Sequence, residues 1–297
     1  MAHLGATEIA QRLGEQSYVA DRGLASALSV AFQLRRPLFL EGEAGVGKTE
    51  VAKAFATAIG ARLIRLQCYE GIDVHQALYD WNYARQMLYM RAVEARDVEA
   101  DGAVEHVFGP EFLIRRPLLE AIATDEPAVL LIDEIDRADD EFEAFLLEVL
   151  SDFQITIPEI GTITAKRRPA VILTSNRTRE LHDALKRRAL FHWIGHPSIE
   201  REVEIVMLRV PGIPETLAKE AAAFVRGLRS LDLVKPPGVA ETIDWAQALA
   251  ALGREEIDAE VVEQTLGSVL KYREDIETVR DETLVGLIEE ARATANR

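Results

Sequence analysis

The sequence has little cysteine and no long apolar run. Its 297 residues include one cysteine, Cys68, which excludes an intrachain disulfide and agrees with a reducing compartment. A lone thiol at a predicted strand end is more often a core residue than a nucleophile. No apolar stretch approaches the roughly 20 residues of a membrane-spanning helix, and residues 1–5 lack the basic and apolar regions of a secretory signal. We therefore expect a cytoplasmic protein without a transmembrane segment, and any membrane association would come through its partners.

Positive charge is also scarce. Lys and Arg total 34 against 50 Asp and Glu, which gives a net charge of −16. Such a surface repels phosphate backbones at long range, so we expect no nucleic acid as the main partner. The commonest meaning of acidity is solubility alone. Hydrophobic residues make up 48% and charged residues 28%, as in a globular protein, and the length predicts one larger and one smaller domain.

One glycine-rich motif carries most of the functional information. It consists of Gly42, Glu43, Ala44, Gly45, Val46, Gly47, Lys48 and Thr49. An apolar run at 37–40 precedes it and a helix-forming run at 51–56 follows, which is the context of a phosphate-binding loop. We expect main-chain amides to face the polyphosphate of ATP, Lys48 to reach its β- and γ-phosphates, and the Thr49 hydroxyl to ligate Mg²⁺. The alternative is an ordinary turn between a strand and a helix, which the complete spacing and both flanks disfavour.

Two further strands end in polar side chains. The apolar run 128–132 leads into Asp133 and Glu134, and the run 170–175 leads into Asn176. We expect Asp133 to hold Mg²⁺ through a water molecule and Glu134 to polarise the water that attacks the γ-phosphate. The Asn176 amide would hold the same water, although an ordinary turn is equally consistent with Asn at a strand end. The acid pair is informative because the glycine loop lies about 85 residues upstream.

Two other segments have a functional and a structural interpretation. Lys186, Arg187 and Arg188 form a basic cluster, which is either a solvated corner or an arginine finger for a nucleotide held by a neighbouring subunit. Residues 18–20 precede the first predicted strand and either contact adenine or pack in the core.

Helical and strand periods alternate up to about residue 197, which predicts a parallel α/β sheet flanked by helices. The chain from 198 to 297 is helical in pattern and predicts a smaller all-helical domain. Residues 70–109 are irregular and include the aromatic segment Tyr79–Tyr83, which indicates an insertion that either packs on itself or contacts a partner. The other predicted elements are helices at 7–35 and 139–150, a helical stripe from 112 to 122, strands at 62–67 and 191–194, and a hairpin at 154–165 around Gly161.

The order of these motifs resembles that of the AAA+ ATPases. Three stretches narrow the resemblance to the MoxR group and its CoxD-like branch: 68–73 (CYEGID), 157–162 (IPEIGT) and 174–181 (TSNRTREL). The resemblance implies an AAA+ nucleotide-binding domain at 1–197 and a helical lid domain at 198–297. The first domain would contain a helix 2 insertion at about 69–107 and a hairpin at about 154–166.

The same resemblance implies roles for individual residues. The segment 42–49 takes the Walker A role, Asp133 and Glu134 the Walker B role, and Asn176 that of sensor 1, while Arg187 or Arg188 matches the finger. One position departs from the pattern, because Glu241 stands where many AAA+ proteins carry the sensor 2 arginine. Closure of the lid onto the γ-phosphate would then use another cation or be weaker.

The resemblance also implies partners. Proteins of this group form rings, typically hexamers of identical subunits, with ATP at the subunit boundaries. They commonly act with a protein that carries a von Willebrand factor A domain and mature metalloenzyme clients, and the CoxD-like branch is linked to copper- and molybdenum-containing carbon monoxide dehydrogenase.

The leading hypothesis is therefore a ring ATPase that remodels a protein client. The first alternative is a nucleotide-dependent binding switch whose ATP-bound form docks a partner protein. The second is a small-molecule kinase, which shares the glycine loop but usually functions without a ring.

Overall fold

The chain folds into two compact units in a computed structural model that describes residues 4–94 and 106–295. Each unit is assembled from several stretches. The first consists of Met1–Ile9, Ser26–Glu41 and Phe55–His192, and the second of Ala10–Ala25, Gly42–Ala54 and Trp193–Arg297. The glycine loop thus clusters with the C-terminal helices, whereas the division predicted after residue 197 groups it with the sheet. That linear division into domains stays a prediction.

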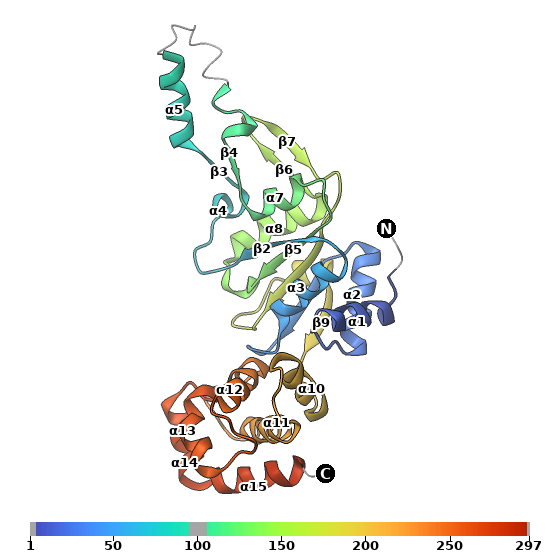
Figure 1. Ribbon diagram of the computed structural model, residues 1–297. Coiled ribbons are helices and arrows are strands. Elements are labelled where there is room, and N and C mark those ends of the chain that lie inside the picture. The colour runs from blue at the N-terminus through green and yellow to red at the C-terminus, as the bar shows by residue number, and fades with distance from the viewer. Residues whose placement is uncertain (1–3, 95–105, 296–297) are drawn as a thin grey trace. The chain divides into compact units, whose positions relative to one another are not determined.

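A five-stranded sheet organises the first unit (Figure 1), with strand order β2-β5-β8-β1-β9. Its strands are β1 (Leu38–Gly42), β2 (Arg62–Gln67), β5 (Ala128–Asp133), β8 (Ala170–Ser175) and β9 (Leu190–Ile194). β1 pairs in parallel with β8, as does β2 with β5 and β5 with β8. All six residues of β5 are buried, as expected for a central strand covered on both faces. The predicted parallel α/β sheet is confirmed.

Helices flank this sheet. They are α1 (Ala6–Glu15), α2 (Arg22–Leu34), α3 (Lys48–Ala58), α7 (Pro117–Ala123), α8 (Asp140–Asp152) and α9 (Asp183–Arg188). The single helix predicted over 7–35 is wrong, because a non-helical segment separates α1 from α2. Ser17 has a positive φ of 59°, and the Asp21 carboxylate accepts a hydrogen bond from the Leu24 amide at 2.6 Å, which caps the start of α2.

The irregular segment after β2 contains short elements of its own. They are α4 (Val74–Leu78), β3 (Tyr79–Trp81), α5 (Tyr83–Glu94), a 3₁₀ turn (Pro110–Phe112) and β4 (Leu113–Arg115). β4 pairs antiparallel with β3, so the helical stripe predicted from residue 112 is wrong over its first residues. Helix α7 begins only at Pro117, which is suited to a first helical turn. Residues 95–105 of the predicted insertion lie outside the described residues.

The aromatic segment divides into a packed and an exposed part. Trp81 is 8% exposed and stacks edge-on against Tyr79 and Phe108, with ring centroids 6.2 and 5.4 Å apart. Tyr83, on α5, is 64% exposed. Self-packing therefore accounts for the segment up to Trp81 and not for Tyr83.

The predicted hairpin is confirmed. β6 (Gln154–Ile157) pairs antiparallel with β7 (Gly161–Thr164). Gly161 has a φ of +97°, which favours glycine at the turn. The final strand predicted at 191–194 corresponds to β9.

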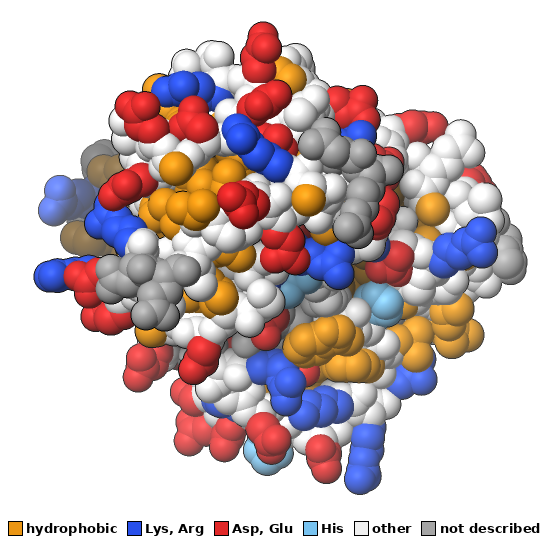
Figure 2. All heavy atoms as spheres, turned by 90° about the horizontal axis from the view of Figure 1, so that it is seen from below, with side chains coloured by type: hydrophobic (Ala, Val, Ile, Leu, Met, Phe, Trp, Pro, Cys, Tyr) orange, Lys and Arg blue, Asp and Glu red, His pale blue; other side chains and the backbone are white. Residues whose placement is uncertain are grey.

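The C-terminal stretch is helical as predicted. Its helices are α10 (Ile199–Arg209), α11 (Glu215–Arg229), α12 (Val239–Ala251), α13 (Ala259–Val269), α14 (Arg273–Glu282) and α15 (Leu284–Ala295). Phe224 and Trp245 pack in its core with ring centroids 5.1 Å apart. Figure 2 shows acidic and basic side chains mixed with small hydrophobic patches on the face that it draws. No helix in the described part of the chain is long and apolar enough to cross a membrane.

Candidate functional site

The glycine loop joins β1 to α3 with its lysine turned inward. Gly45 and Gly47 have φ angles of +78° and +91°, which L side chains rarely adopt. Lys48 is 6% exposed, and its Nζ donates to the main-chain oxygens of Gly42 at 2.8 Å and Glu43 at 2.6 Å. A buried ammonium group held above a turn of main-chain amides at a helix start is suited to a polyphosphate.

The start of α12 packs directly against this loop. The Ala240 amide donates to the Gly45 oxygen at 3.1 Å, and a Cβ added at Gly238 would lie 2.7 Å from the Ala44 oxygen. Glu241 lies here as well. Its Oε2 accepts from the Gly238 amide at 2.9 Å and would lie 2.8 Å from a Cβ added at Gly45. Glu241 therefore caps its own helix against the loop.

A cavity of about 330 Å³ opens beside the loop. It is lined by Gly45, Val46 and Gly47 together with Tyr18 and Val19. Its volume falls at the lower end of the range for small-molecule sites. Burial raises the pKa of the Tyr18 hydroxyl well above its ordinary value, so Tyr18 stays protonated. Tyr18 and Val19 therefore line a cavity beside the loop, and contact with adenine stays a prediction for them.

Helix α10 supplies the cations of the cavity wall, which are Arg201 and Arg209. The Arg201 guanidinium donates to the Val19 oxygen at 2.6 Å and to the Asp21 carboxylate at 3.1 Å. Its Nε atom is buried and has no hydrogen-bond partner among the residues that the structure describes. Sequence reasoning missed Arg201, because it is about 180 residues from the segment that it holds and belongs to no local motif.

The predicted acids occupy the carboxyl end of β5 in the first unit. Asp133 is 1% exposed, and both of its oxygens are engaged. Oδ1 accepts from the Thr174 hydroxyl at 2.5 Å, and Oδ2 accepts from the Arg65 guanidinium at 2.6 and 2.9 Å. The Asp133 carboxylate is thus fixed in orientation by the strands on either side, β8 and β2.

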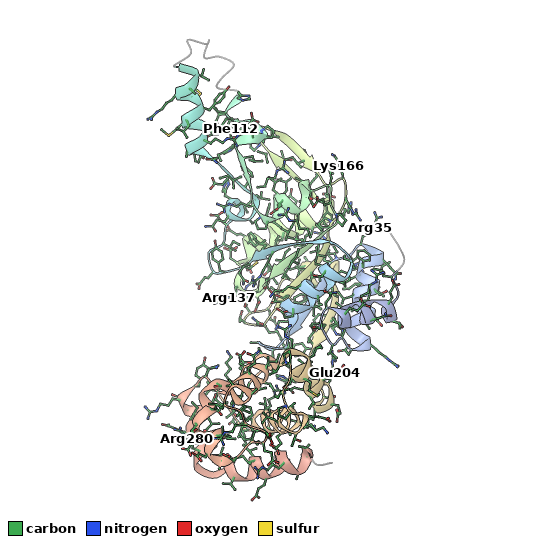
Figure 3. All side chains as sticks on the ribbon, viewed as in Figure 1. Arg35, Phe112, Arg137, Lys166, Glu204 and Arg280 are labelled. Atoms are coloured by element: carbon green, nitrogen blue, oxygen red, sulfur yellow. The ribbon has the colours of Figure 1, made fainter. Side chains whose placement is uncertain are left out.

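Glu134 follows in a strained conformation. Its φ of 55° is in the left-handed region, which is unusual for a residue with a side chain. Its amide donates to Thr174 at 2.9 Å, and its Oε2 accepts from Gln67 at 3.1 Å. Arg137, labelled in Figure 3, lies 3.6 Å from the same oxygen. These contacts stabilise the strained conformation, and the Glu134 carboxylate lies just beyond the carboxyl end of β5.

Asn176 is positioned through its main chain. Its amide nitrogen donates to the Asp136 carboxylate at 3.2 Å, and the Thr178 amide donates to the same oxygen at 2.8 Å. The side-chain amide of Asn176 has no hydrogen-bond partner among the residues that the structure describes, so its donor and acceptor are available. The structure thus brings Asp133, Glu134 and Asn176 to one edge of the sheet, since β5 and β8 are neighbours.

The two candidate finger residues differ in their contacts. The Arg188 guanidinium donates to the Leu147 oxygen at 2.8 Å. Arg187 is exposed, and within the described ranges its guanidinium has neither an ion-pair nor a hydrogen-bond partner. Both stand in the last turn of α9. Arg187 is therefore the better candidate for a contact outside its own chain.

Cys68 does not behave as a nucleophile. The thiol is fully buried, and its burial, followed by the charges of Asp133 and Asp136, raises its pKa to about 12. A thiol with that pKa carries almost no thiolate near neutral pH. The interpretation of Cys68 as a core residue is the one that the structure supports.

A glycine loop between a strand and a helix, in a chain whose central strand ends in two acids, is typical of P-loop ATPases of the AAA type. A model of the AAA domain (dynein-related subfamily) matches residues 37–189, which is half of the chain, and the chain belongs to this family. The matched segment covers the glycine loop, Asp133, Glu134, Asn176 and the basic cluster. This match identifies the AAA domain family and does not distinguish the MoxR group or its CoxD-like branch within it.

One curated relative and two solved structures illustrate what the chain is similar to. The chaperone protein ClpB 2 of Parasynechococcus marenigrum (strain WH8102) is 35% identical over 147 residues, 48% of this chain but 14% of that protein. The RuvB Holliday junction branch migration motor of Thermotoga maritima aligns with a TM-score of 0.47 and 16% identity, over 86% of this chain and 68% of that one. A point mutant of the same motor aligns with a TM-score of 0.49 and 16% identity, over 89% of this chain and 70% of that one.

Proposed function

We propose that this chain hydrolyses ATP in a ring of identical subunits and uses the energy to remodel a protein client. The observation that carries the hydrolytic part is the set of Asp133, Glu134 and Asn176 on adjacent strand ends, each fixed by contacts from other strands or loops. Buried, oriented polar groups of this kind lower a barrier because they need not reorganise during the reaction.

The residues fit Mg²⁺ and ATP in their chemistry. Thr49 and Asp133 supply oxygen donors, which a hard cation prefers. In the described residues no group of three or more acids, histidines or cysteines could hold a metal ion by themselves. When bound, the ion would neutralise charge on the phosphates.

Each protein group then has a defined task. Lys48 and the amides of 43–48 bind the β- and γ-phosphates, and the cavity at Tyr18 and Val19 takes the base. Glu134 accepts the proton of the attacking water, which the Asn176 amide orients. Arg187 of one subunit stabilises the charge that develops on the nucleotide of the next subunit.

Binding and hydrolysis in the intact chain test this proposal. With Mg²⁺ the chain should bind a labelled ATP analogue saturably and turn ATP over. Lys48→Ala should lose binding, whereas Lys53→Ala, an exposed lysine on the same helix, should retain it. Wild-type protein that shows neither saturable binding nor turnover would refute the proposal.

Subunit mixing tests the ring. Arg187→Ala subunits retain the glycine loop, and Lys48→Ala subunits retain the finger. A mixture should therefore recover activity that neither variant has alone. No recovery at any ratio would exclude catalysis across subunits.

The finer proposal is a MoxR-type, CoxD-like maturation factor. Its support is the three stretches named above, and with them come a partner with a von Willebrand factor A domain and a metalloenzyme client such as copper–molybdenum carbon monoxide dehydrogenase. Capture with Glu134→Gln in the presence of ATP should retain both proteins. Their absence from that complex would remove the maturation role and leave the ATPase intact.

The nucleotide-dependent switch remains the second candidate, and one contact favours it. Because the Ala240 amide bonds to Gly45, occupancy of the glycine loop is sensed by α12 without hydrolysis. A partner whose affinity differs between ATP and ADP, with no client-stimulated turnover, would support this candidate. The kinase alternative is set aside, because the family that matches is that of the AAA domain.

A further inference from the structure

Four arginines line one cavity of the sheet unit, and no acid does. The cavity has a volume of about 440 Å³ and lies where α2, α8 and α9 end. Its cations are Arg35, Arg36, Arg168 and Arg188, and its apolar wall is formed by Leu34, Pro37, Leu147, Leu150, Phe153, Leu185 and Ala189. In a chain with 50 acids and 34 bases, such a concentration of cations requires an explanation.

Two of the arginines have structural tasks. Arg36 donates to the main-chain oxygens of Arg187 and Arg188 at 2.8 and 3.3 Å, and Arg188 donates to Leu147 at 2.8 Å. These carbonyl groups lie at or near the C-terminal ends of α8 and α9, where a cation interacts favourably with the negative end of the helix dipole. Structural capping therefore accounts for Arg36 and Arg188.

The other two have no such task. In the part of the chain that the structure describes, the Arg35 guanidinium has no hydrogen-bond or ion-pair partner, and the Arg168 guanidinium has only its position over the Phe153 ring, 5.1 Å from the centroid. Arg35, labelled in Figure 3, joins α2 to β1 with a φ of 52°. The guanidinium groups of both residues are exposed. Some other arginines in the described part of the chain pair with acids, as Arg65 does with Asp133 and Arg229 with Glu202.

The wall of the cavity indicates the chemistry of the occupant. Leu34 is 58% exposed beside the cations, so the site offers apolar contact as well as charge. A small inorganic anion uses the charge alone. A protein segment that carries carboxylates and aliphatic side chains uses both, and guanidinium groups bind carboxylates in a bidentate manner.

We propose that this cavity receives a carboxylate-bearing segment from a second copy of this chain. The inference rests on the proposed ring. The proposal is supported by continuity with the candidate finger, because Arg188 lines the cavity and the residue before it, Arg187, is the one that would reach the neighbouring subunit. The chain itself, with a net charge of −16, supplies the complementary acids. The interface therefore holds the helix that carries the finger.

Sedimentation of the full chain with Mg²⁺ and an ATP analogue tests the inference. Wild-type protein should self-associate, and less so as salt rises. Arg35→Glu/Arg168→Glu should raise the dissociation constant of self-association at least tenfold, and Arg35→Gln/Arg168→Gln should raise it less. The matched control Arg115→Glu/Arg226→Glu makes the same change in charge at exposed arginines outside the cavity and should associate as wild type does.

Several outcomes are decisive. Thermal unfolding confirms that each variant is folded. Self-association of Arg35→Glu/Arg168→Glu at the wild-type dissociation constant would overturn the inference, and so would a wild-type chain that turns ATP over as a monomer. If wild type self-associates and the variant does not, but neither binds nor hydrolyses ATP, the interface stands and the proposed function fails. Equal weakening by the control pair would assign the effect to net charge and not to the cavity.

Discussion

Two buried acids in this molecule have nearly the same immediate partners. Asp133 at the end of β5 and Glu202 on α10 are each 1% exposed. Each accepts from an arginine, Arg65 or Arg229, and each accepts from a threonine hydroxyl, at 2.5 Å from Thr174 and 2.6 Å from Thr242. A buried carboxylate with an arginine and a threonine is therefore not by itself a mark of chemistry.

The surroundings of the two acids differ. Arg229 is 10% exposed and also donates to the Pro237 oxygen at 2.7 Å, so the pair on α10 is closed within the helical core. Arg65 is 46% exposed. Asp133 is followed by Glu134 in a strained conformation, and the neighbouring strand ends in Asn176, whose amide is available. The closed network fixes three helices, whereas the open one presents polar groups that can act on a substrate.

The largest expected effect is on the open network. Glu134→Gln should lower ATP turnover about 10³-fold, because the amide cannot accept the proton of the attacking water. Its free energy of unfolding should stay within about 0.5 kcal/mol of wild type, since Glu134 is at the strand edge. Steady-state turnover and urea unfolding measure the two quantities. Glu148→Gln, an exposed acid on α8, is the control, and turnover near the wild-type rate in Glu134→Gln would assign the base elsewhere.

The next effect is on the closed network. Arg229→Met should lower the free energy of unfolding by about 3–5 kcal/mol, because it leaves the Glu202 charge buried without a partner. Arg65→Met should cost less, since water reaches that pair. Urea unfolding gives both values. Arg226→Met, at an exposed position on the same helix, should change little, and a similar loss in Arg65→Met would contradict the distinction between the two networks.

A smaller effect is expected at the threonine of the open network. Thr174→Val removes the donor to Asp133 and the acceptor of the Glu134 amide, and should cost about 1–3 kcal/mol of unfolding free energy. Turnover should fall about tenfold, because the orientation of both acids is relaxed. Thr164→Val, on the exposed face of β7, serves as the control. Unchanged turnover at lower stability would make Thr174 a purely structural residue.

The smallest effect concerns pH. Burial, and then the charge of Arg229, lower the pKa of His196 below its ordinary value. The unfolded chain therefore binds this proton more readily than the folded chain, and stability should fall as the pH drops below about 6.5. Unfolding of His196→Gln between pH 5 and 8 should show a weaker decline than wild type. His182 is largely exposed, so the stability of His182→Gln should fall with pH as that of the wild type does.

Local pattern predicted the elements that carry the site. The strands predicted at 62–67, 128–132, 170–175 and 191–194, the hairpin and the helical C-terminal stretch all form, because apolar periodicity and turn residues act within a few positions. The two errors, a continuous helix at 7–35 and a helix at 112–114, arose where a capping aspartate and a strand pairing overrode the apolar pattern. Neither signal is visible in hydrophobic spacing.

The sequence by itself determined which groups can act on a nucleotide, because the glycines, the lysine and the strand-terminal acids are recognised by residue type and spacing within short segments. Only the tertiary structure decided what holds them. Arg65 and Thr174 reach Asp133 from strands 68 and 41 residues away, and Arg201 reaches Val19 over 182 residues. The Arg188 guanidinium contacts Leu147, whereas the adjacent Arg187 has no side-chain partner among the described residues. These pairings depend on how distant segments pack around the sheet and the helical core, and no local spacing specifies them.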